Sequence, residues 1–105
     1  MNAKRRKSLA AKGWKSVTVA EFLGLTPEEE AYIEVKLILS EKLRARRGEL
    51  ALTQAQLAEK IGSHQTRVAK MEASDASVSV DLLLRALFAT GMTPRELGKT
   101  LAAAA

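Results

Sequence analysis

The sequence contains no cysteine and only one histidine, His64, among its 105 residues. Without cysteine the chain has no disulfide framework, no thiolate metal site and no cysteine nucleophile. A lone histidine with neither a cysteine nor a carboxylate pair offers little for acid–base or nucleophilic catalysis. Gly-rich phosphate-binding loops are missing as well. An enzyme is therefore the weakest hypothesis, and we expect neither a metal nor a cofactor.

Aromatic residues are also scarce, at 4% of the chain, although apolar residues make up 47%. The core must therefore be built from Leu, Ala, Val and Ile, which is typical of packed helices. No apolar run approaches the ~18 residues that span a membrane. The basic start of the chain is not followed by the ~7 to 15 apolar residues of a signal peptide. These absences predict a cytoplasmic protein with no membrane partner.

The positive charge is concentrated at the N-terminus. The chain carries 17 Lys and Arg against 12 Asp and Glu, which gives a net charge of +5. Six basic residues and no acid lie in residues 1–15, so the other ninety residues hold 11 basic and 12 acidic side chains. We predict a basic, flexible arm over residues 1–15 and one helical domain over residues 16–101. The arm is either a solvated extension or a segment that contacts DNA, and Trp14 either anchors it to the core or docks on a partner protein.

Helix starts are marked by four segments in which Thr is followed three residues later by Glu or Gln, the spacing of a capping box. Proline at the first helical position supports two of these starts, and glycines mark several helix ends. The four boxes are Thr18–Glu21, Thr26–Glu29, Thr53–Gln56 and Thr93–Glu96. The pattern predicts an all-α chain with helices over residues 19–23, 27–49, 54–61, 64–73, 80–90 and from 94 onward, and with Ala102–Ala105 as a fraying end.

Apolar residues at helical spacing predict the inward faces of these helices. In the longest helix, Ile33, Leu37 and Leu43 share one stripe, which Val35, Ile38 and Leu39 widen. Near the C-terminus the same spacing occurs in Leu83, Leu84, Leu87 and Phe88. The stripe on the longest helix is broader than one side of a five-helix domain needs, so it is either core or an interface with another protein.

The segment from Leu52 to Glu72, LTQAQLAEKIGSHQTRVAKME, is the most informative for function. It predicts two short helices joined by a turn at Gly62, where glycine tolerates a left-handed backbone, and thus a helix-turn-helix over residues 53–73. The outward side of the second helix carries Gln65, Thr66, Arg67 and Lys70. All four are hydrogen-bond donors and none is an acid, which suits base edges and phosphates in a major groove.

These residues resemble the Xre/Cro, or lambda-repressor-like, family of helix-turn-helix regulators. LTQAQLAEKIG and QTRVAKME are similar to its second helix and its recognition helix, and DLLLRALFATGMTPREL is similar to its fourth and fifth helices. The resemblance covers about residues 43–98. It implies a five-helix domain, here preceded by a short helix, and binding of a homodimer to an inverted-repeat operator in double-stranded DNA. Residues 13–39 resemble small family members that act as HigA-like antitoxins, which implies an RNase-type toxin as a partner.

The resemblance also implies roles for individual residues. Gln54 matches a residue that bonds a phosphate or reaches a base, and Arg67 matches a flanking position that contacts the DNA backbone. Gln65, Thr66 and Lys70 match residues that contact base edges. Arg47 and Glu72 match a buried ion pair that joins the first helix of the family fold to the recognition helix.

Two positions depart from the family pattern. His64 stands where the family has a Ser or Thr cap, so we expect Ser63 to cap the recognition helix instead. Ala51 and Leu52 replace the usual Gly-Leu, so we expect the helix that ends near Glu49 to run long or to bend.

The sequence thus predicts a sequence-specific repressor, in particular the antitoxin of a HigBA-like module that regulates its own operon. One alternative is a protein-binding module that neutralises a toxin through its N-terminal arm and binds DNA only weakly. Another is a non-specific nucleic-acid binder driven by the basic arm.

Overall fold

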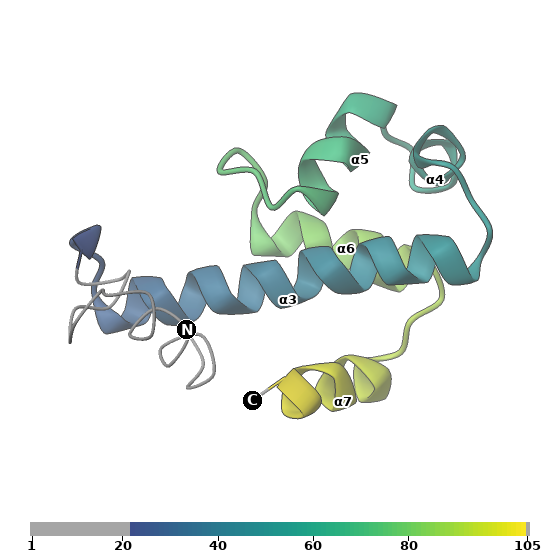
Figure 1. The fold of residues 1–105 in the computed structure, drawn as a ribbon. Helices are drawn as coiled ribbons and strands as arrows, with labels where there is room; N and C mark the ends of the chain where they lie inside the picture. The colour runs from purple at the N-terminus through teal and green to yellow at the C-terminus, as the bar shows by residue number, and fades with distance from the viewer. Residues whose placement is uncertain (1–21, 105) are drawn as a thin grey trace, which may run out of the picture. The chain divides into compact units, whose positions relative to one another are not determined.

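The structure is a computed structural model that describes residues 22–104 of the chain. The chain divides into two compact units, Met1–Glu34 together with Ala105, and Val35–Ala104. The described residues contain five complete helices and no strand, so the predicted all-α fold is confirmed (Figure 1). The helices are α3 (Pro27–Glu49), α4 (Gln54–Lys60), α5 (Gln65–Glu72), α6 (Val80–Ala89) and α7 (Pro94–Ala104). None of these five is long and apolar enough to cross a membrane.

The described part of the first unit, residues 22–34, contains the start of α3. The Thr26 hydroxyl accepts the Glu29 N–H at 3.1 Å and the Glu29 carboxylate accepts the Thr26 N–H at 3.3 Å, so the predicted capping box is confirmed. Three glutamates in the first turn stabilise α3, because their negative charges interact with the positive end of the helix dipole. Gly24 has a φ of 70°, which suits the predicted helix end there. The predicted arm, the predicted box at Thr18–Glu21 and most of the predicted helix over residues 19–23 lie outside the described residues.

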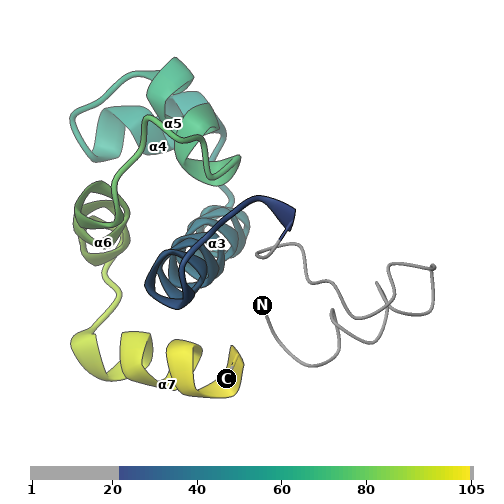
Figure 2. The same cartoon turned by 90° about the vertical axis from the view of Figure 1, so that its left-hand side faces the viewer.

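The second unit has an aliphatic core, as the composition predicts. Figures 1 and 2 show the part of α3 after Glu34 lying between the α4–α5 pair and α7, with α6 alongside. Burial of these side chains supplies the main stabilising free energy. The core residues are Leu39, Leu43, Leu57, Ala58, Val68, Met71, Val78, Leu83, Ala86, Leu87 and Met92.

The inward face of α3 differs from the predicted stripe. Its buried residues include Lys36 and Ser40 beside Leu39 and Leu43, whereas Ile33 is 47% exposed. Of the two alternatives given for the predicted stripe, core or interface, Ile33 does not fit the core. Apolar spacing also cannot show that a lysine takes an inward position. The Lys36 stem is buried while its ammonium group donates to the backbone carbonyl of Asp75 at 2.6 Å. Phe88, also predicted to be inward, is exposed on α6.

Four helices end in the same two-bond motif around a residue with a left-handed backbone. At the end of α3, Leu52 N–H donates to the Arg47 carbonyl and Ala51 N–H to the Gly48 carbonyl, both at 3.0 Å. Ala51 therefore has a φ of 55°, and α3 ends at Glu49 without running on. Glycine fills the equivalent position after α4 and α6, at Gly62 and Gly91, as predicted, whereas Ser74 fills it after α5.

The starts of α4 and α7 show how far the capping prediction extends. The reciprocal box at Thr53 and Gln56 is complete, with bonds of 3.1 and 2.8 Å. At Thr93 the hydroxyl accepts the Glu96 N–H at 3.2 Å, but the Glu96 carboxylate accepts from the hydroxyl of Thr93, so only half of that box is formed as predicted. Helix α7 continues to Ala104, so it includes most of the stretch that was predicted to fray, and Ala105 lies outside the described residues.

Candidate nucleic-acid interface

Helices α4 and α5 pack directly on each other and form the corner of the predicted helix-turn-helix. Gly62, with a φ of 68°, turns the chain after α4, and the Ser63 N–H then donates to the Ala58 carbonyl at 2.8 Å. Leu57 of α4 and Val68 of α5 are completely buried, and Ala58 is small enough for the helices to approach closely. The relative orientation of α4 and α5 is therefore fixed by core packing.

Helix α5 begins without a side-chain cap. His64 occupies the N-cap position but makes no capping hydrogen bond. The Ser63 hydroxyl is buried without a hydrogen-bond partner, so the expectation that Ser63 caps the helix is wrong. The first turn of α5 thus keeps backbone N–H groups that no side chain satisfies, and such groups can donate to an anion such as a phosphate.

The structure brings four of the predicted DNA-binding residues together on the exposed side of α5. Val68 and Met71 are buried on its opposite side, which leaves Gln65, Thr66, Arg67 and Lys70 exposed. Beside them lies a groove of about 340 Å³, between α5 and the loop that precedes α6. Its lining includes His64 and Ser77 together with Thr66, Arg67 and Lys70. This surface presents amide, hydroxyl, guanidinium and ammonium donors.

One carboxylate lies in the loop opposite α5. The Asp75 carboxylate accepts the backbone N–H of Ser77 at 2.9 Å and also bonds the Ser77 hydroxyl. These two bonds, mainly the one from the hydroxyl, lower the pKa of Asp75 below its ordinary value, and the charges of Lys70 and Lys36 add to the effect. Lys36 additionally holds the Asp75 carbonyl. The loop that walls the groove is thus fixed by α3.

Arg47 and Glu72 form a two-pronged ion pair between α3 and α5. Arg47 Nε lies 2.6 Å from Glu72 Oε2, and Arg47 Nη2 lies 3.0 Å from Glu72 Oε1. The side chains are 21% and 6% exposed, respectively, and the pair raises the pKa of Arg47 above its ordinary value through the hydrogen bond to Glu72. Arg47 Nη1 also donates to the Leu52 carbonyl at 3.0 Å. One guanidinium therefore joins α5, α3 and the connection before α4.

Gln54, the remaining predicted residue, is on α4 and is partly buried, whereas the other four are exposed on α5. Its Nε2 donates to Glu72 Oε1 at 3.3 Å, which connects the first residue of α4 to the last residue of α5. Neither this bond nor the Lys36–Asp75 bond was predicted. The partners are 18 and 39 residues apart, so no helical spacing could have indicated them.

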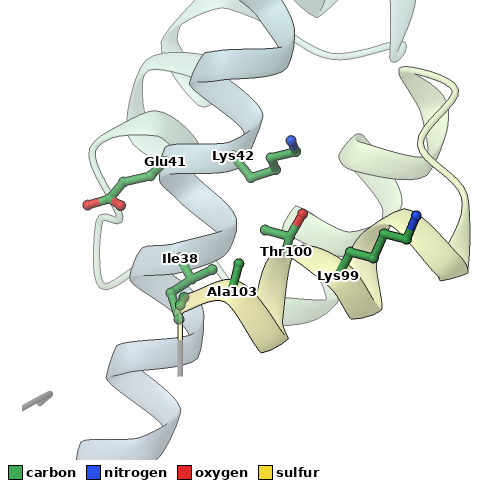
Figure 3. Close-up of a pocket in the computed structure, with 7 residues that line it drawn as sticks. Ile38, Glu41, Lys42, Lys99, Thr100 and Ala103 are labelled. Atoms are coloured by element: carbon green, nitrogen blue, oxygen red, sulfur yellow. The ribbon is translucent and has the colours of Figure 1, made fainter.

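A second groove, of about 560 Å³, lies between α3 and α7 (Figure 3). Its lining mixes Glu41 with two lysines and apolar residues, and no residue of α4 or α5 contributes to it. The charges there have both signs, whereas the lining of the groove beside α5 includes Arg67 and Lys70 and no acid.

The comparisons with known proteins agree with this geometry. A helix-turn-helix family model matches residues 43–97, which is more than half of the 105 residues. The match begins near the end of α3, includes α4, α5 and α6, and ends within α7. Comparisons with curated proteins and with solved structures gave no match.

Proposed function

The chain belongs to the Xre/lambda-repressor-like helix-turn-helix family of DNA-binding regulators, and from this premise we propose that it is a sequence-specific transcriptional repressor. The observation that carries the proposal is the exposed side of α5, where four donor side chains lie together and no acid occurs in the first turn. A helix of this kind suits the major groove, where base edges and phosphates supply acceptors.

The residues on α5 have different roles in this proposal. Gln65, Thr66 and Lys70 contact base edges, and Arg67 contacts the DNA backbone beside them. A good bidentate contact contributes about 1–3 kcal/mol of discrimination against a wrong base. Phosphate contacts add affinity and orientation but little sequence preference. We therefore expect the loss of Gln65 or Lys70 to reduce specificity more than the loss of Arg67.

A single recognition helix contacts only about 4 to 5 base pairs, so the proposed repressor acts as a homodimer on an inverted repeat, with half-sites about one helical turn apart. Operator binding would keep it on the nucleoid. Selection of bound DNA from a random pool tests this directly. Enrichment of an inverted repeat supports the proposal, whereas recovery of unrelated sequences would contradict it.

We further propose that the chain is the antitoxin of a HigBA-like module and represses its own operon. Support comes from the apolar residues that α3 exposes, among them Tyr32, Ile33 and Val35, because exposed apolar patches are typical of protein interfaces. A neighbouring reading frame for a small, basic, RNase-like protein is expected. If that protein is co-expressed and does not co-purify with this chain, the antitoxin proposal fails while the repressor proposal stands.

A second candidate is a module that neutralises a toxin through its N-terminal arm, whose residues 1–15 hold six basic side chains and no acid, and that binds DNA only weakly. The two candidates differ in what the arm does. Removal of residues 1–15 would abolish toxin binding and leave only the weak DNA binding in the second candidate, whereas a repressor keeps its operator preference after the same removal.

A further inference from the structure

A third pocket, of about 200 Å³, lies between α5 and α6. Its apolar lining includes two half-buried side chains, Ile61 and Leu82, and Ala89, which is the exposed last residue of α6. A molecule that covers these side chains removes apolar surface from water, which favours binding. Pockets that enclose drug-sized ligands measure about 300–1,000 Å³, so this pocket suits only a smaller molecule.

Two guanidinium groups line the same pocket, one from each helix. Arg67 belongs to α5, and its side chain makes no hydrogen bond within residues 22–104. Arg85 belongs to α6 and uses its Nε in an exposed pair with Asp81 at 3.0 Å, which leaves its Nη groups available. None of the described residues that line the pocket is acidic. Because a guanidinium binds a carboxylate through two parallel hydrogen bonds, the pocket is suited to an organic anion.

The pocket is also lined by a residue with an unsatisfied polar atom. The hydroxyl oxygen of Ser63 is buried, and it has no hydrogen-bond partner in the described part of the chain. The large majority of buried side-chain polar atoms have a partner in the protein or in a bound molecule. A serine hydroxyl can donate to a carboxylate oxygen. Ser63 is therefore an independent indication that a ligand with hydrogen-bond acceptors completes this site.

The apolar and polar parts of the lining together select one class of ligand. A hydrocarbon body covers the apolar side chains, while a carboxylate meets the guanidinium groups of Arg67 and Arg85. A neutral apolar molecule would leave both cations unpaired, and an inorganic anion would leave the apolar side chains in water. The volume restricts the hydrocarbon body to a single ring or a short branched chain.

We propose that this pocket binds a small organic carboxylate, and that this ligand competes with DNA for Arg67. Among the described residues, only Arg67 lines both this pocket and the groove of about 340 Å³ beside α5. In the proposed repressor Arg67 contacts the DNA backbone, so a carboxylate bonded to its guanidinium removes that contact. The ligand then weakens operator binding, and by linkage the operator weakens ligand binding by the same factor. The competition rests on the proposed repressor function, whereas binding of the carboxylate does not.

The first part of the test measures ligand binding by ¹H–¹⁵N NMR titration of the full chain without DNA. The probes are sodium benzoate and sodium isovalerate, with benzamide as a neutral analogue of benzoate and sodium phosphate as an inorganic anion, all at constant ionic strength. We expect at least one of the two carboxylates to cause saturable shifts confined to the turn around Ser63, to α5 and to α6. Benzamide and phosphate should bind at least about tenfold more weakly, because each lacks one of the two features that the pocket recognises.

Two variants locate the binding site within the chain. Ala89→Phe places a large side chain at the pocket and should abolish the shifts, and Arg85→Ala should weaken carboxylate binding about tenfold. The matched controls are Ala102→Phe and Arg95→Ala, which make the same changes at exposed positions of α7 and should bind like the wild type. Ala89 and Arg85 are both exposed, so we expect both variants to fold, and the dispersion of their NMR spectra checks this. If Ala89→Phe does not fold, Arg85→Ala and its control decide the question.

Three results would overturn the binding proposal. One is that neither carboxylate causes saturable shifts. Another is that benzamide or phosphate binds as well as the carboxylates do. The third is that Arg85→Ala and Arg95→Ala bind the carboxylate equally, because the anion would then not be held in the pocket.

The second part of the test measures the competition by fluorescence anisotropy on the operator selected by the wild-type protein. A saturating carboxylate should weaken operator binding at least about fivefold at constant ionic strength. The salt dependence of log K should become shallower by about 0.9 for each protomer, because one phosphate contact is lost. Ala89→Phe should bind the operator normally and should not respond to the carboxylate. An equal response in Ala89→Phe, or weaker operator binding by this variant without any carboxylate, would contradict the competition.

The two parts fail for different reasons. A wild-type protein that selects no operator refutes the repressor proposal, while the NMR titration still decides whether the pocket binds a carboxylate. A selected operator whose affinity does not change when the pocket is saturated refutes the competition for Arg67 and leaves the repressor proposal in place.

Discussion

Breaking the Arg47–Glu72 pair should cost far more stability than breaking an exposed pair on the same molecule. The perturbation is Arg47→Met, which keeps an apolar stem but removes the guanidinium. Exposed ion pairs contribute about 0.2–1 kcal/mol, whereas removing one partner of a buried pair costs about 3–5 kcal/mol. The side chain of Glu72 is 6% exposed and that of Arg47 is 21% exposed, so water has some access to the arginine. The pair therefore resembles a buried ion pair more than an exposed one. We therefore expect a loss of about 2–3 kcal/mol.

The assay is urea unfolding followed by circular dichroism at neutral pH. Arg85→Met is the matched control, because Arg85 pairs with Asp81 at 3.0 Å while both side chains are more than 70% exposed. The control should lose less than about 0.5 kcal/mol. The double variant Arg47→Met/Glu72→Leu should lose clearly less than the sum of the single variants, since it leaves no unpaired buried charge. Equal losses in Arg47→Met and Arg85→Met would show that burial does not strengthen the Arg47–Glu72 pair.

Three further predictions concern the helix end, the loop and the arm. Ala51→Gly should stabilise the protein by about 0.5–1 kcal/mol in urea unfolding, because the φ of 55° is strained for alanine; destabilisation would contradict this. The pKa of Asp75 is lowered in the folded state. Its carboxylate therefore adds to the free energy of unfolding above about pH 4, and this contribution is lost as the pH falls further. The difference in the free energy of unfolding between the wild type and Asp75→Asn should shrink only below that pH. Removal of residues 1–12 should leave the ratio of operator affinity to random-DNA affinity unchanged. The salt dependence of binding should become shallower in proportion to the number of phosphates that the arm neutralises. A fall in the affinity ratio would mean that the arm contributes to the recognition of bases.

Local chemistry made much of the fold predictable. The bounds of α3 follow from the Thr26 cap and Pro27 at its start, and those of α4 follow from the Thr53 box and Gly62. These signals lie within a few residues of the features that they specify. The ends of α4, α5 and α6 and the start of α5 differ from the predicted bounds by one residue, which is the usual uncertainty of a helix end.

The remaining features depend on contacts between distant parts of the chain. A lysine normally indicates a solvated surface, yet Lys36 is buried because the Asp75 carbonyl, 39 residues away, receives its ammonium group. A serine side chain caps helices better than a histidine side chain, but the turn after Gly62 buries the hydroxyl of Ser63. The Gln54–Glu72 bond likewise exists only because α4 and α5 pack together. Sequence spacing contains no information about such pairs.

If the exposed side of α5 contacts bases, its variants should lose more binding free energy on the selected operator than on random DNA. Gln65→Ala and Lys70→Ala should each lose about 1–3 kcal/mol of binding free energy on the operator and much less on random DNA. Lys99→Ala, which removes an exposed lysine from α7, serves as a charge control and should preserve the ratio of the two affinities. Equal losses on the operator and on random DNA would show that the exposed side of α5 does not contact bases.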